Sequence, residues 1–314
     1  MEGAGVKSEK LSTRQLAVAV MVGGLSVGAA AAGRTDWRWL LASVPIGMLV
    51  GWGLLRRVGH RPLNPILNAL YGIWAVALMA EVLRRTADRV QAASGNRENT
   101  GWLLVLLALP LIWMGWGKAA AFFRAVEIFW LGLLVTVAAI LLLGVPRVEW
   151  RWVMEPAGSW WESMLAGVNV LSAGLFVLPH LYNVEKEPGG THRGLMWLGA
   201  LGLLSAALGA LTAGLLSPAV AAKVDAPFFA AAGLLGDSAR LEGLVSALWL
   251  LPDLTLAGLL AHAWGERRWP ALAVIAALGL ALTGITERLP GIAAPVGCLI
   301  LVALTAALPP GGKK

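Results

Sequence analysis

The sequence predicts an all-α fold, a polytopic membrane protein of about ten transmembrane helices in two inverted repeats of five. Three observations lead to this fold class: an apolar composition, apolar segments of membrane-spanning length, and two small-residue interruptions in corresponding segments. Of the 314 residues, 58% are hydrophobic and 14% are charged, with a mean hydropathy of +0.73. This composition lies outside the range of ordinary soluble domains.

Ten apolar segments are each long enough to cross about 30 Å of hydrocarbon, or to do so nearly. They lie at residues 15–33, 37–55, 64–83, 101–117, 122–144, 162–181, 194–216, 241–264, 269–286 and 290–308. Many of the 16 tryptophans fall at segment ends, where amphipathic rings favour the membrane interface. These are Trp37, Trp39, Trp102, Trp150, Trp152, Trp160, Trp161, Trp264 and Trp269.

An even number of spans places both termini on one side of the membrane, and a small excess of Lys and Arg assigns that side to the cytoplasm. The net charge of +7 is then a topology signal and an attraction to anionic lipid headgroups. No interleaved basic and aromatic groove indicates a nucleic-acid partner. We therefore expect a protein of the cell membrane with cytoplasmic N- and C-termini and the lipid bilayer as its surroundings.

The ten spans divide into five and five. We expect an N-terminal tail at 1–14, a first repeat at 15–145, an outer loop at 146–161, a second repeat at 162–308 and a C-terminal tail at 309–314. Because five is odd, the second repeat begins on the opposite side of the membrane, which gives inverted topology. Polar loops are expected at 84–100 and 217–240, and Pro227 to Ala232 in the second predicts an interfacial or re-entrant helix.

Segments one and six, equivalent in an inverted array, both carry small-residue interruptions, at Val22–Gly28 and Gly167–Gly174. Unwound backbone survives in a membrane only where it lines a cavity or binds something, so this pair predicts a midplane binding site. Exposed amides of segment one would receive a ligand carboxylate, and segment six its amino group. The candidate ligand-binding residues are Gly23, Gly24, Leu25, Ser26, Gly28, Asn169, Ser172 and Gly174. The alternative is close helix packing through small residues, with interhelical hydrogen bonds.

Ionisable residues within the spans are the next candidates, because a charge at the bilayer centre costs at least ~2.5 kcal/mol on insertion scales. Asp253 follows Pro252, which removes a helical hydrogen bond. Its carboxylate is expected to hold a cation, couple to protons, or be satisfied by a neighbouring helix. Arg124 and Glu127, three residues apart, share a helix face and predict an ion pair with a structural or gating role.

Nothing in the sequence indicates a catalytic centre or a cofactor. HExxH, GxSxG and P-loop motifs are absent, and no two of the four histidines have metal-ligand spacing on a helix. The single cysteine, Cys298, cannot form an internal disulfide. We therefore expect a protein that is not an enzyme, with no metal site and no cofactor.

Four stretches, taken in order, resemble the spore germination permeases, the B subunits of germinant receptors. They are Lys10 to Leu16 leading into the first helix, Gly117-Lys118 through Arg124 and Glu127, Gly174 to Pro179, and Arg240-Leu241-Glu242 through Trp249. The resemblance covers nearly the whole chain through short motifs. A Gly-Thr-Gly-like turn of the family appears here as Ser26-Val27-Gly28, and the loops are short. The changed turn affects which ligand the site would accept, and the short loops affect the surface on which partner subunits would dock.

The family belongs to the amino acid-polyamine-organocation superfamily. The resemblance therefore implies a LeuT-like fold with broken first and sixth helices and a small nutrient, such as an amino acid, bound between them. It also implies receptor partners of the A and C types and a place in the spore inner membrane. Two alternatives stay open at this point. One is a secondary transporter in which Asp253 or Glu127 couples amino acid uptake to protons or sodium, and the other is a structural subunit without a working site.

Overall fold

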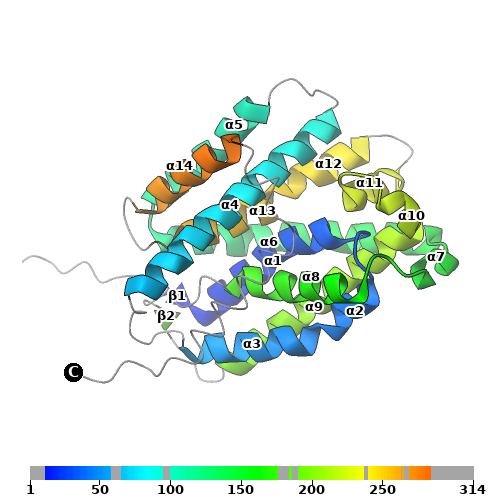
Figure 1. Cartoon of the computed structure of the whole chain (residues 1–314), viewed down its shortest axis with the longest axis horizontal. Coiled ribbons are helices and arrows are strands. Elements are labelled where there is room, and N and C mark those ends of the chain that lie inside the picture. Colours follow the sequence, from blue (N-terminus) through cyan, green and yellow to red (C-terminus); the bar gives the residue numbers. More distant parts are fainter. Residues whose placement is uncertain are drawn as a thin grey trace, which may run out of the picture.

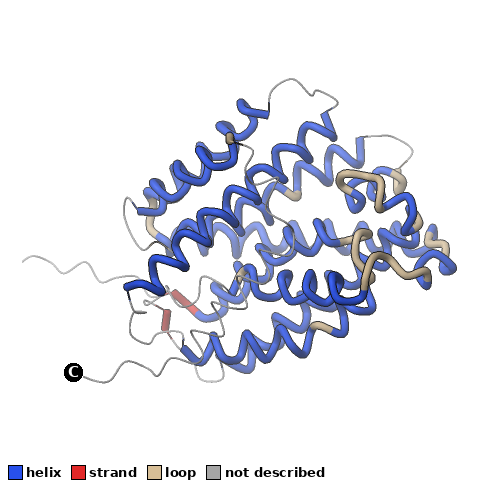
Figure 2. The backbone as a smooth tube through the Cα atoms, in the orientation of Figure 1, coloured by secondary structure: helices blue, strands red, loops and turns tan. Residues whose placement is uncertain are grey.

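The computed structural model describes residues 11–57, 65–94, 100–175, 184–185, 190–236, 240–262, 264 and 269–283. Nearly all described elements are helices (Figure 2). The elements are β1 (Leu11–Ser12), α1 (Thr13–Ala31), α2 (Trp37–Ala42), α3 (Val44–Arg57), α4 (Pro65–Ser94), α5 (Thr100–Trp116), α6 (Ala119–Gly144), η1 (Val145–Arg147), α7 (Trp150–Met154), α8 (Trp160–Ala173), β2 (Val184–Glu185), α9 (Gly190–Leu216), α10 (Pro218–Ala221), α11 (Pro227–Gly233), α12 (Arg240–Leu248), α13 (Leu250–His262) and α14 (Trp269–Leu282).

Four stretches of helix within the described residues are long and apolar enough to cross a membrane. They are Thr13–Ala31, Ala119–Arg147, His192–Leu216 and Leu241–His262, and the helices Thr100–Trp116 and Trp269–Leu282 are apolar but shorter. The described residues thus form an almost entirely helical, multi-pass membrane protein. The expected count of ten spans is not confirmed. The second expected span is divided at Ser43 into α2 and α3, and the tenth, 290–308, lies outside the described residues.

Helix α1 occupies the centre of the bundle and packs against α6, α8, α9 and α13 (Figure 1). Its side chains from Val18 to Ala29 are buried on every face, as expected for an apolar helix surrounded by other helices. Helix α6 lies at the periphery, where Ile128, Leu131 and Val135 are exposed. In a membrane protein such large exposed apolar side chains face lipid.

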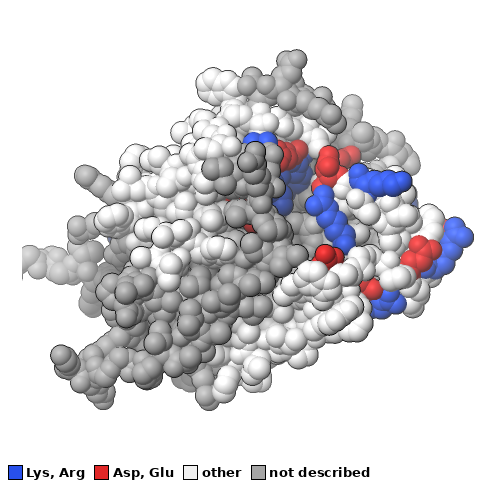
Figure 3. All heavy atoms as spheres, viewed as in Figure 1, with Lys and Arg blue, Asp and Glu red and all other residues white. Residues whose placement is uncertain are grey.

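On the face shown in Figure 3, charged side chains gather toward one end of the molecule. They lie over the C-terminal half of α4, the α10–α11 segment, α7 and the start of α2, while most of the other described surface in this view carries no charge. The uncharged part of this face suits the hydrocarbon of a membrane, and its charged end suits the aqueous or headgroup region.

The expected unwinding of segment one is wrong, because α1 runs without a break through Val22–Gly28. Packing explains why these glycines are present. A Cβ on Gly24 would lie 2.3 Å from Leu201 Cδ2 and 3.1 Å from the Val170 carbonyl oxygen, and one on Gly28 would lie 2.5 Å from Ser205 Oγ. The small residues therefore permit close helix contact, which was the alternative explanation for this pattern.

The interruption in segment six has a different form from the expected one. Helix α8 is continuous through Gly167 and ends at Ala173, with Gly174 as its C-cap. Gly174 abuts α1, where a Cβ would lie 2.9 Å from the Val20 carbonyl oxygen. The rest of the expected span, from residue 176, lies outside the described residues.

Two further expectations about helix ends need correction or refinement. The expected loop at 84–100 is wrong over its first part, because α4 continues to Ser94. The eighth segment is divided at Trp249 into α12 and α13, as expected from Pro252, which has no N–H to donate to the Leu248 carbonyl.

The expected helix in 217–240 is present as α11. A short parallel pairing joins β1 to β2 at Leu11 and Val184 and so fixes the start of the first segment.

Candidate functional site: a charged cavity between α1, α4 and α11

The C-terminal half of α4 carries five charged residues on successive turns: Glu81, Arg84, Arg85, Asp88 and Arg89. Two pairs form along the helix, Arg84 with Asp88 at 3.2 Å and Arg85 with Glu81 at 3.6 Å. Spacing by four residues places such partners on one face. The helix therefore presents a charged ridge, and its partly exposed ion pairs contribute little to stability by themselves.

The side chain of Arg89 points from this ridge into the protein interior. Its Nη1 lies 2.5 Å from Asp253 Oδ2 on α13, and the two side chains are 6% and 2% exposed. Arg89 Nε donates to Ser246 Oγ on α12 at 3.3 Å, and the guanidinium lies 4.6 Å from the centre of the Phe229 ring. A buried pair needs such additional contacts, because neither charge has water to solvate it.

Ser26 on α1 joins the buried pair to the ridge. Its hydroxyl donates to Asp253 Oδ1 and accepts from Arg85 Nη2 at 2.9 Å. The contacts therefore run from Arg85 through Ser26 and Asp253 to Arg89. This chain links α4, α1 and α13 within a buried region, where hydrogen bonds are stronger than in water.

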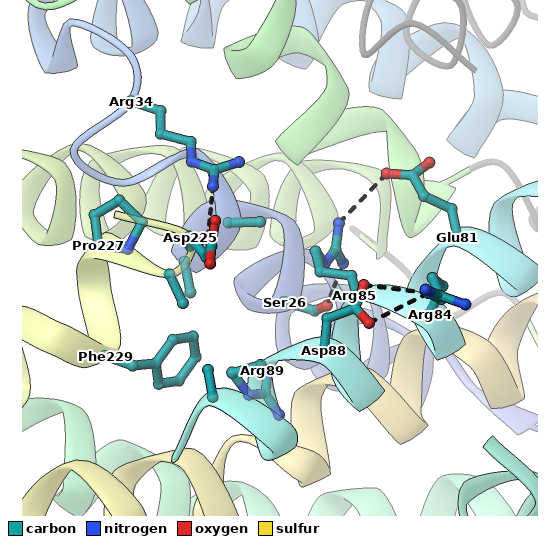
Figure 4. Close-up of a pocket in the computed structure, with 14 residues that line it drawn as sticks. Ser26, Arg34, Glu81, Arg84, Arg85, Asp88, Arg89, Asp225, Pro227 and Phe229 are labelled. Atoms are coloured by element: carbon teal, nitrogen blue, oxygen red, sulfur yellow. Dashed lines mark hydrogen bonds and ion pairs between the residues drawn. The ribbon is translucent and has the colours of Figure 1, made fainter. Parts of the chain in front are cut away.

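The ridge forms one wall of a cavity of about 490 Å³ (Figure 4). Helix α1, the turn that follows it and the N-terminal part of α11 supply the other walls. The lining residues are Ser26, Ala29, Ala30, Arg34, Glu81, Arg84, Arg85, Asp88, Arg89, Ala92, Asp225, Ala226, Pro227 and Phe229. The volume is in the usual range for small-molecule sites, and the lining offers charges of both signs.

The segment before α11 and α11 itself close one side of the cavity. Arg34 Nη2 donates to the carbonyl oxygens of Asp225 and Val224, the latter at 3.4 Å. On α11, the Phe228 ring lies 4.7 Å from the ring of Trp249, at the break between α12 and α13. The aromatic contacts therefore connect the cavity wall to the element that carries Asp253.

Of the sequence-predicted site residues, the structure brings Ser26 and Asp253 together. Gly23, Gly24 and Gly28 lie on α1 against Leu256, Leu201 and Ser205 respectively, and Leu25 is fully buried. Since α1 is a regular helix here, its amides are engaged in the helix and do not face a ligand.

Asn169 and Ser172 are on α8. In the described part of the chain, Asn169 Oδ1 and Ser172 Oγ are buried without a hydrogen-bond partner. A buried polar atom without a partner is uncommon and calls for an explanation. A ligand role for these two residues, and for Gly174 at the end of α8, stays a prediction.

Glu127 on α6 lies away from the cavity. Its carboxylate pairs with Arg14 Nε at 3.1 Å and accepts from Gln15 Nε2 at 3.4 Å. These contacts join α6 to the start of α1. The exposed Arg124 lies one turn earlier on α6, and gating by Arg124 and Glu127 stays a prediction.

Sequence reasoning missed the ridge residues from Arg84 to Arg89 because their charges made residues 84–100 look like a loop. It also did not select Glu81, which lies inside the expected span 64–83. A signal was present, since Glu81, Arg85 and Arg89 repeat every four residues, as on one face of a helix. The buried Asp253 also required a cationic partner. As for metals, no cluster of three or more His, Cys, Asp or Glu side chains suited to an ion occurs among the described residues.

No family model matches the sequence, and no curated protein matches it. A solved structure with a similar fold is that of MHP1, a nucleobase-cation-symport-1 family transporter, in a closed conformation with bromovinylhydantoin bound. The TM-score is 0.65 at 12% sequence identity, and the match covers 94% of this chain and 75% of the MHP1 chain. At this identity the similarity establishes the fold. The chain has a LeuT-like fold, and a shared fold does not by itself determine the function.

Proposed function

We propose that this protein binds a small nutrient, an amino acid, in the cavity between α1, α4 and α11. The observation that carries the proposal is the chain of contacts from Arg85 at the cavity through Ser26 to the buried Asp253 and Arg89. A ligand held at Arg85 touches a side chain that is already bonded to α1. Binding then acts on the packing of α1, α4 and α13.

The lining charges suit a zwitterion. The guanidinium of Arg85 has five N–H donors in a planar fork that matches a carboxylate, more than its contacts with Ser26 and Glu81 use. Glu81 and Asp225 lie on different sides of the same cavity, and the carboxylate of either can pair with an ammonium group. Both charged groups of an amino acid therefore find side chains of opposite charge in the cavity. The small residues Ala29 and Ala30 leave room for its side chain.

We further propose that the protein is the membrane subunit of a germinant receptor in the spore inner membrane, acting with A- and C-type subunits. The sequence resemblance supports this role, and the similarity to MHP1 agrees with the LeuT-like fold that the resemblance implies, apart from the unbroken α1. In such a subunit the nutrient shifts a conformational equilibrium. The buried chain from Arg85 to Arg89 connects the ligand to helices that change their packing.

The second candidate is a gradient-driven amino acid transporter, which the similarity to a symporter fold favours. In that function Asp253 has to exchange a proton or a cation. Its carboxylate is bonded to Arg89 and Ser26, so coupling there requires the pair to separate. Uptake into liposomes distinguishes the functions. Concentrative uptake driven by an imposed gradient and lost in Asp253→Asn favours the transporter, and saturable binding without flux favours the receptor subunit.

Titration calorimetry of the purified protein with a panel of amino acids tests the binding site. We expect saturable binding of at least one amino acid, loss of binding for its amide and N-acetyl derivatives, and about 10- to 100-fold weaker binding in Arg85→Met, as for a lost charged hydrogen bond. Arg151→Gln, on an exposed arginine of α7, is the matched control and keeps full affinity. Equal affinity in wild type and Arg85→Met contradicts the assignment.

A further inference from the structure

A second cavity, of about 190 Å³, lies between α1, α5, α6 and α13, away from the charged ridge. Its described lining is apolar apart from one threonine. The lining residues are Val22, Met114, Phe122, Ala125, Val126, Phe129, Leu133, Leu251, Leu254 and Thr255. Such a lining offers water almost no hydrogen bonds, so the cavity excludes water.

The cavity borders the exposed apolar side of α6. Phe129, at its edge, is 53% exposed, and its neighbour Ile128 on α6 is 72% exposed. Val22 and Thr255 form the buried inner end. Helices α5 and α6, both described in full, each pack on α13 but are not a closely packed pair. Among the described residues, we take the space between these two helices as the lateral entrance to the cavity.

We propose that this cavity holds the end of an acyl chain from a bilayer lipid. The entrance faces the lipid-exposed side of α6, where acyl chains are the surrounding solvent. An empty void forfeits dispersion contacts along its lining, and an inserted chain restores them. The size is adequate, since an apolar protein cavity of about 150 Å³ can accept benzene.

An acyl chain in this cavity lies beside the functional site but does not touch the charged side chains there. Val22 lies one helical turn from Ser26 on α1, and Leu254 adjoins Asp253 on α13. The acyl chain therefore contacts the two helices that carry the Ser26–Asp253 hydrogen bond. This binding is independent of any nutrient in the charged cavity, so the two proposals can fail separately.

Photo-crosslinking in nanodiscs tests the proposal. The full-length protein is reconstituted with a phosphatidylcholine that carries a diazirine at the end of one acyl chain, and labelled peptides are mapped by mass spectrometry. We expect adducts on Val22 or Thr255, which are buried, as well as on exposed Ile128. Adducts confined to the exposed residues of α6 overturn the proposal.

A variant that fills the cavity provides the second arm. Ala125→Phe places a ring in the space and should lower adducts on Val22 and Thr255 at least tenfold, with Ile128 labelling unchanged. Leu131→Phe, on an exposed position of the same helix, is the matched control and keeps the wild-type pattern. Leu254→Phe replaces Ala125→Phe if the latter does not fold. Inner labelling that persists in the folded filled variant overturns the proposal.

Discussion

Arg89 and Asp253 are the residues on which the account depends most. Each carries a charge in a region almost closed to solvent. Burial of an isolated ion is very unfavourable, and a buried pair is tolerated because each charge and its hydrogen bonds offset the desolvation of the other. The pair therefore stabilises the packing of α4 on α13 only while both side chains are present.

Removal of Arg89 alone should destabilise the protein strongly. We expect Arg89→Gln to cost about 3–5 kcal/mol, because it leaves the Asp253 carboxylate buried and unpaired. Thermal unfolding in detergent measures the loss, and Arg151→Gln should be neutral. The double variant Arg89→Met, Asp253→Leu should recover most of the stability while losing the link to Ser26. An unchanged melting temperature in Arg89→Gln contradicts the buried pair.

Asp36, in the turn between α1 and α2, gives a pH-dependent prediction. Burial acts to raise its pKa, but hydrogen bonds and the charge of Arg38 outweigh burial, so the pKa of Asp36 lies below its ordinary 3.8. Because the folded pKa is below the unfolded one, the stabilisation is present above the unfolded pKa and is lost as the pH falls through the folded value.

The measurement compares the melting temperatures of wild type and Asp36→Asn. Asparagine also caps helices well, so the comparison isolates the charge of Asp36. We expect the difference to be largest near pH 7 and to shrink below a pH of about 4. Glu155→Gln, at an exposed position, is the control. A difference that grows on acidification has the wrong sign for this account.

Residue-level sequence reasoning selected Asp253 and Ser26 as candidates but did not select Arg89 and Arg85, which contact them. A carboxylate within an apolar run is visible locally, because its cost does not depend on its partner. Its partner Arg89 is 164 positions away along the chain and looked like part of a charged loop. Which cation meets Asp253 depends on how α4 packs on α13, and the local sequence does not contain that information.

At the scale of elements, the glycines of α1 illustrate a different limit. A glycine pair lowers helix propensity by about 1 kcal/mol per residue, which made unwinding plausible. In the structure the missing Cβ atoms allow α8, α9 and α13 to approach α1 closely. The same glycine pattern suits an unwound helix and a closely packed one. The helices that pack against α1 decide which of the two forms, and they lie far from α1 in the sequence.

Alanine substitutions distinguish packing glycines from the others. Gly24→Ala should destabilise by about 1–3 kcal/mol, because its Cβ meets Leu201 and the Val170 carbonyl oxygen. Gly132→Ala on α6 should be neutral or stabilising, since a Cβ there meets nothing within 4 Å. Thermal unfolding of the two variants provides the test. Gly24→Ala as stable as Gly132→Ala would show that α1 is not tightly packed at this point.

For the whole molecule, composition and hydropathy were sufficient to predict a multi-pass helical membrane protein, because lipid leaves the backbone few alternatives to helices. The LeuT-like fold came from the sequence resemblance and agrees with the similarity to MHP1. The position of the cavity could not be predicted in the same way. It forms where α1, α4 and α11 meet, and most of the charged ridge on α4 falls in the segment that was expected to be a loop.

The central claim is that the nutrient occupies the charged cavity, and cysteine protection measures this directly. In a Cys298→Ala background, Ala30→Cys reports from the cavity lining, and Ala93→Cys, exposed on α4 outside the lining, is the control. The rate of modification by a charged thiol reagent is followed during titration with an amino acid that binds in calorimetry. We expect protection of Ala30→Cys with a midpoint at the calorimetric Kd and no protection of Ala93→Cys. Modification of Ala30→Cys at an unchanged rate under saturating ligand would contradict it.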